Sequence, residues 1–145
     1  MYADYVFYTD TFYGTAINAA DFPRLASRAS DFIDYYTRGK AVFVSDETTL
    51  NALAKCCCAI AEQMQIDSQS NALMAKKISD AISSQNGEIK SETVGSWSQS
   101  YATANDYIKT GGSADATKNA RAAYVAIAQE YLANTGILYR GGCLW

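Results

Sequence analysis

The chain has 145 residues, of which 49% are hydrophobic and 19% are charged, a composition typical of a globular domain and not of a disordered segment. It contains no histidine, which excludes His-dependent catalytic triads and His-based zinc sites. Its net charge of −3, with no basic run longer than Lys76-Lys77, argues against nucleic-acid binding through phosphate contacts. We expect a single domain over 1–145 that is stable without disulfides or metals.

The N-terminal part is predicted to hold an aromatic arm and an amphipathic helix. The arm, residues 1–13, is expected to be extended and to pack on its own core or on a neighbour. A helix over 21–38 follows, with Asn18 or Asp21 as N-cap and Gly39 as left-handed C-cap. Apolar residues recur along this helix at spacings of three and four: Phe22, Leu25, Ala26, Ala29, Phe32, Ile33 and Tyr36.

Two further helices are predicted, at 46–66 and 72–84. Residues 41–44 are expected to be a short extended link, after which Ser45 or Asp46 caps the first of the two. The polar stretch 67–71 predicts a loop between them. The apolar face of helix 46–66 consists of Leu50, Leu53, Ala54, Cys57, Ile60, Ala61 and Met64.

The cysteines follow neither a metal-binding nor a disulfide pattern. Three of them, Cys56, Cys57 and Cys58, are consecutive in a helical stretch, and the fourth is Cys143. Neighbours on a helix point about 100° apart, so the three thiols cannot converge on one metal ion. We expect reduced thiols, with Cys57 in the core and its neighbours at contacts between elements.

The C-terminal part predicts a hairpin, a helix and an apolar arm. Alternation over 88–102 predicts a β-hairpin with a positive φ at Gly95, which needs a further surface because two strands alone are marginally stable. A helix over 114–134 ends at Gly136, and the arm 137–145 is apolar enough to require burial, for which a partner is a natural place. The predicted fold is mainly α: a small bundle of three to four helices with an inserted β-hairpin and extended N- and C-terminal arms.

No catalytic or cofactor-binding set is predicted. Asp31 and Asp34 lie three residues apart, but Arg28 is close enough along the helix to pair with both on a solvated face. No glycine-rich phosphate loop is present. No signal peptide and no apolar stretch of about 18 residues is visible, so we expect synthesis in a cytoplasm and no membrane contact. We expect that the protein is not an enzyme and that it binds neither a cofactor nor a metal ion.

Three segments, in order, share patterns with one family of proteins. Residues 21–37, DFPRLASRASDFIDYYT, look like an opening helix of that family. Residues 89–101, IKSETVGSWSQSY, are similar to its Ser-Glu-x-Val-Gly-x-aromatic-Ser-x-x-Tyr stretch, and residues 131–142, YLANTGILYRGG, match its C-terminal Tyr-Leu-x-x-Thr-Gly-Leu-Leu-Tyr-Arg-Gly ending. By these three segments the chain resembles the head–tail connector (adaptor) proteins of long-tailed bacteriophages. The stretch 67–86 has no counterpart in this comparison.

The resemblance implies a structural virion protein, made in the bacterial host cytoplasm, that forms a dodecameric ring in the head–tail neck. The ring would bind the portal protein on one side and a tail-proximal neck protein, a stopper or tail terminator, on the other. DNA would pass through the lumen without sequence-specific binding. By analogy, portal or other partner contacts are expected at Ile137, Leu138, Tyr139, Arg140, Leu144 and Trp145. Contacts with a neighbouring subunit or the next ring are expected at Val94, Gly95, Trp97 and Tyr101.

Two other readings stay open from the sequence. One is a different neck or tail assembly protein, such as a head-completion stopper or tail terminator, and a spectrum dominated by helix would count against these β-rich proteins. The other is a non-viral helical interaction module, for which a stable monomer indifferent to portal protein would be the sign.

Overall fold

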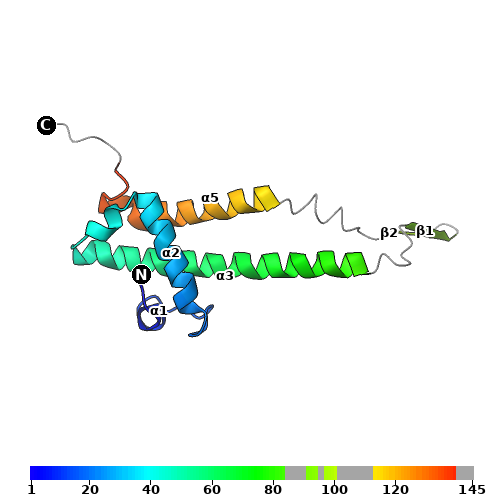
Figure 1. Cartoon of the computed structure of the whole chain (residues 1–145), viewed down its shortest axis with the longest axis horizontal. Helices are drawn as coiled ribbons and strands as arrows, with labels where there is room; N and C mark the ends of the chain where they lie inside the picture. The colour runs from blue at the N-terminus through cyan, green and yellow to red at the C-terminus, as the bar shows by residue number, and fades with distance from the viewer. Residues whose placement is uncertain (84–90, 95–96, 101–112, 140–145) are drawn as a thin grey trace. The chain divides into compact units, whose positions relative to one another are not determined.

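The computed structural model describes residues 1–83, 91–94, 97–100 and 113–139, without the side chains of residues 81, 91–100 and 113–116. The described part is mainly α-helical, as predicted (Figure 1). The chain divides into two compact units, one formed by Met1–Ile66 and Ala120–Trp145 and the other by Asp67–Asn119. The single domain over 1–145 stays a prediction.

The N-terminal arm is not extended, and this prediction was wrong. Residues Tyr5–Asp10 form helix α1, capped by Asp4, whose carboxylate accepts a hydrogen bond from the Phe7 amide at 2.8 Å. Tyr5, Tyr8 and Phe12 are spaced by three and four residues, so one side of this segment is apolar in a helix but not in a strand. Of the two alternatives, packing on the chain's own core is the one observed, since Tyr8 is fully buried.

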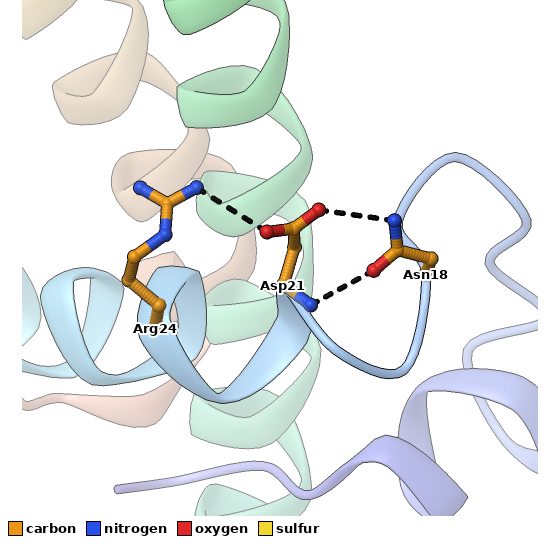
Figure 2. Close-up of polar contacts among 3 residues, drawn as sticks. All are labelled: Asn18, Asp21 and Arg24. Carbon is orange, nitrogen blue, oxygen red and sulfur yellow. Dashed lines mark hydrogen bonds and ion pairs between the residues drawn. The ribbon is translucent and has the colours of Figure 1, made fainter.

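Helix α2 spans Phe22–Thr37, within one residue of the prediction. Of the two predicted N-caps, Asp21 is the one observed, and its side chain makes no capping bond. In the turn before the helix, the Asn18 side-chain oxygen accepts the Asp21 amide at 2.8 Å (Figure 2). The Asn18 side-chain nitrogen donates to the Asp21 carboxylate at 3.0 Å, and Arg24 lies 3.8 Å from the same carboxylate. The buried residues of α2 are Phe22, Leu25, Ala26, Ala29, Ser30, Ile33 and Thr37.

After α2 comes the 3-10 helix η1, Lys40–Phe43, where the sequence predicted an extended link. Helix α3 then spans Glu47–Ser83 without interruption, so the predicted loop at 67–71 was wrong. That stretch contains neither proline nor glycine, and polar residues such as serine and glutamine lower helix stability only slightly in solvent. The two predicted helices 46–66 and 72–84 are therefore one.

The core of the first unit surrounds the N-terminal half of α3. Cys56, Cys57 and Cys58 are each fully buried. Three successive residues span about 200° of a helix circumference, so α3 must be covered on several sides. The Cys57 thiol lies 3.4 Å from the Ala26 carbonyl of α2. The predicted core position of Cys57 is confirmed, whereas Leu50 is 42% exposed and lies outside the core.

The remaining elements are two short strands and helix α5. Strands β1, Ser91–Val94, and β2, Trp97–Ser100, pair antiparallel with Val94 opposite Trp97. The turn at 95–96 and residues 88–90 and 101–102 of the predicted hairpin lie outside the described residues, so that hairpin stays a prediction. Helix α5 spans Ser113–Leu132, and the 3-10 helix η2, Ala133–Thr135, follows it and ends at Gly136.

Candidate functional site

The C-terminal end of α2 turns through two residues with left-handed backbone. Arg38 has φ 55° and Gly39 has φ 75°. The Arg38 amide donates to the Tyr35 carbonyl at 3.2 Å, and the Gly39 amide donates to that of Asp34 at 2.8 Å, which is the hydrogen-bond pattern of a Schellman motif. A left-handed residue other than glycine costs about 1–2 kcal/mol, and such strain concentrates at functional sites. An arginine thus occupies a position where glycine would be unstrained.

Helix η1 directs two apolar side chains into solvent. Ala41 is buried, and its amide faces the Thr37 hydroxyl at 3.4 Å. A 3-10 helix has three residues per turn, so burying Ala41 turns the next two residues away from the core. Val42 is 65% exposed and Phe43 is 87% exposed. Val42 and Phe43 are adjacent in sequence and both exposed, so η1 presents a small apolar surface beside Arg38 and Lys40.

The segment after α5 ends beside η1. Gly136, at φ 72°, starts a turn in which the Tyr139 amide donates to the Gly136 carbonyl at 3.1 Å. Ile137 enters the core in this turn, and Tyr139 is left 67% exposed. The Lys40 ammonium donates to the Tyr139 carbonyl at 2.7 Å, which holds the end of the described chain against η1.

Together these residues form a surface that we call the basic apolar patch, made of Arg38, Lys40, Val42, Phe43 and Tyr139. A depression of about 280 Å³ lies at its edge. Both charged groups at the depression, Arg38 and Lys40, are cationic, and the Tyr36 hydroxyl there accepts from Gln129 at 3.2 Å. The depression is lined by Tyr36, Thr37, Arg38, Lys40, Gln129, Ile137 and Leu138. Chemically, the patch can bind an anionic and apolar partner surface.

The predicted arm residues divide between core and surface. Ile137 is 9% exposed and belongs to the core of its own chain, which leaves little of it for a partner. Leu138 packs partly against the same core and lines the depression, and Tyr139 is exposed. Arg140, Leu144 and Trp145 lie outside the described residues.

The predicted hairpin residues are placed only at the backbone level. Val94 and Trp97 face each other in the β1–β2 ladder, and Gly95 and Tyr101 lie outside the described residues.

Four residues of the patch were missed from the sequence: Arg38, Lys40, Val42 and Phe43. Val42 and Phe43 fell in the predicted link 41–44, where an apolar pair is as consistent with a buried strand as with an exposed turn. The available signal was that Arg38 and Lys40 flank Gly39 directly before this pair, which places two cations beside two apolar residues.

The buried thiols do not make a reactive site. Burial raises the pKa of Cys56 and of Cys58 to about 12, which disfavours the thiolate, the nucleophilic form. Within the described ranges, no cluster of histidine, cysteine, aspartate or glutamate side chains is arranged to hold a metal ion.

Asp31 and Asp34, the two carboxylates three residues apart on α2, lie in different environments. Asp34 accepts a hydrogen bond from the Tyr2 hydroxyl, and burial together with that bond raises the pKa of Tyr2. Asp31 is exposed to solvent. In the part of the chain that the structure describes, no ion pair joins Arg28 to either aspartate, so the predicted pairing is not observed.

No family model matches the chain, and no match is found among curated proteins or among solved structures. Among the described helices, none has the length and apolar character needed to cross a membrane.

Proposed function

We propose that the chain is a structural subunit of the neck of a long-tailed bacteriophage. It forms a ring, dodecameric by analogy, between the portal vertex and the tail, extends the DNA channel, and performs no catalysis. Support comes from three sequence segments that resemble head–tail connectors in the same order, at 21–37, 89–101 and 131–142. The virion is its place of action, and the host cytoplasm is its place of synthesis.

The main observation in support of this proposal is the position of the third segment, residues 131–142, whose described part ends at an exposed tyrosine. Residues 131–142 match the connector ending, and their described part runs from Tyr131 at the core to Tyr139 on the basic apolar patch. There the Lys40 ammonium of η1 donates to the Tyr139 carbonyl and holds the end of the segment. An exposed aromatic side chain held by a partly buried turn is the kind of anchor that binds a protein partner.

The finer features belong to the proposal as well. The helices form the subunit body, the hairpin over 88–102 contacts a neighbour or the next ring, and the arm 137–145 contacts the portal. Given the burial of Ile137, portal contact would begin at Leu138 and Tyr139. The stopper or tail terminator binds the opposite face of the ring, and DNA passes through without base-specific contacts.

The deciding experiment is the mass of the purified chain by light scattering, alone and mixed with the portal protein of the same phage. A ring of identical subunits on the portal is the expected result. A monomer that ignores the portal would overturn the proposal and favour a non-viral interaction module.

A variant pair tests the described end of the arm in the same assay. Tyr139→Ser removes the exposed aromatic at this end without touching the core, so the fold should persist while portal binding weakens by about tenfold or more. Leu73→Ser is the matched control, because Leu73 is 55% exposed on α3 and lies outside the arm. Equal binding by both variants would remove Tyr139 from the proposed contact.

A further inference from the structure

A second exposed apolar surface lies at the other end of α2. Val6 and Asp10 are four residues apart on α1 and therefore share one face of it, and both are exposed, Val6 to 63%. Tyr13, at φ 58°, follows the helix and is 80% exposed. We call Val6, Asp10 and Tyr13 the acidic apolar patch.

The contacts of α1 fix its place. The Tyr5 and Tyr8 rings lie 5.7 and 4.8 Å from the ring of Phe22, the first residue of α2. The basic apolar patch begins at Arg38, directly after the last residue of α2. A helix of 16 residues is about 24 Å long, so one copy cannot bring its two patches together. Figure 1 shows α1 at one end of α2 and the start of α3 near the other.

The two patches carry opposite charge. Residues 1–20 contain Asp4 and Asp10 and no lysine or arginine, whereas residues 38–43 contain Arg38 and Lys40 and no acid. The next acid along the chain is Asp46, at the start of α3 and outside residues 38–43. Residues 38–43 therefore carry a net positive charge.

We propose that the acidic apolar patch of one copy docks on the basic apolar patch of the next copy. Val6 and Tyr13 cover Val42 and Phe43, and Asp10 lies opposite Arg38. Two different surfaces of one chain then meet in a heterologous contact, which repeats around a closed ring. This inference deepens the proposed function and rests on it for ring closure, and it names the surfaces through which the copies bind.

The experiment is a charge swap measured by sedimentation velocity on the full chain. Asp10→Arg and Arg38→Asp each place like charges opposite each other, and the double variant restores opposite charges in reversed order. Aspartate tolerates left-handed backbone well, so Arg38→Asp preserves the turn after α2. Asp31→Arg is the matched control for Asp10→Arg, with the same charge change at an exposed position of α2 outside both patches.

Wild type and Asp31→Arg are expected to self-associate between about 10 μM and 1 mM, less strongly at high salt. Each single swap should weaken association by about tenfold or more, and the double swap should recover most of the loss. Restoration of binding by a second substitution cannot come from misfolding, so it separates a contact from a folding defect.

Three outcomes would overturn this interface. One is a wild type that stays monomeric at the highest concentration, another is a double swap as weak as the single variants, and the third is single swaps without effect. If rings still form on the portal in any of these cases, the proposed function stands and the copies meet through other surfaces. If Arg38→Asp loses portal binding but keeps self-association, the basic apolar patch binds the portal instead.

Discussion

The Tyr8 side chain fastens the N-terminal segment to α3. Its hydroxyl donates to the Glu62 carboxylate at 2.7 Å and accepts the amides of Ala16 and Ile17 at 3.0 and 3.1 Å. Burial and the bond to Glu62 raise the pKa of Tyr8 to about 12. Because the folded pKa lies above the unfolded value of 10, this stabilisation is complete below pH 10 and is lost as the pH rises toward 12.

Gly14 is required at this site because a side chain there has no room. A Cβ at Gly14 would overlap the Tyr8 ring, which cannot withdraw without breaking its three hydrogen bonds. We predict that Gly14→Ala lowers the free energy of unfolding by about 3 kcal/mol, measured by urea denaturation.

The control is Tyr8→Leu, which replaces the aromatic ring by a smaller aliphatic side chain. If the overlap is the cause, Gly14→Ala should cost much less in the Tyr8→Leu background than in the wild type. Additive effects of the two substitutions would contradict the explanation.

At the scale of elements, α3 illustrates how helix ends are decided locally. Of the two predicted caps, Ser45 and Asp46, it is Asp46 that caps the helix through the amide and hydroxyl of Thr49, and these bonds lower the pKa of Asp46. No comparable signal exists at 67–71, and continuation of the helix there followed from the absence of any residue that stops it.

The capping bonds predict an acid dependence. A folded pKa below the unfolded value means that the Asp46 contribution is present above the ordinary pKa of 3.8 and is lost as the pH falls through the lowered value. Asp46→Asn keeps a good cap without a titrating group, so the stability difference between wild type and this variant should shrink in acid. Thermal melts between pH 2 and pH 6 measure it.

Asp46→Ala serves as the comparison, because it removes the cap at every pH. It should lower the melting temperature below that of Asp46→Asn throughout the range. A wild-type advantage that stays constant down to pH 2 would show that the carboxylate charge does not strengthen the cap.

At the scale of the molecule, the segment 136–139 serves both core and surface. We predict that Ile137→Ala lowers the free energy of unfolding by about 3 kcal/mol, because Ile137 is 9% exposed within the core. Tyr139→Ala, at a position 67% exposed, should change it by less than about 0.5 kcal/mol. Urea denaturation of both variants measures the contrast.

Because Ile137 is buried and Tyr139 is exposed, the point at which the C-terminal segment is truncated matters. Removing residues from 137 onward takes away a core side chain, whereas removing residues from 140 onward leaves the described core intact. Only the second truncation tests partner binding separately from stability. Equal loss of stability in Ile137→Ala and Tyr139→Ala would contradict the division.

Local chemistry determined much of this protein. Helix α2, the Asp46 cap, the end at Gly136 and the core position of Cys57 followed from spacing and capping rules, because those rules act between residues close in sequence. Only the tertiary structure decided which of the remaining apolar residues are covered. It buried Cys56, Cys58 and Ile137 and left Val42, Phe43 and Leu50 exposed. Burial depends on which distant segments pack against each face of an element. Phe43 and Ile137 are both apolar, so the hydrophobic effect favours burying either one, but the fold places neighbours around Ile137 and not around Phe43.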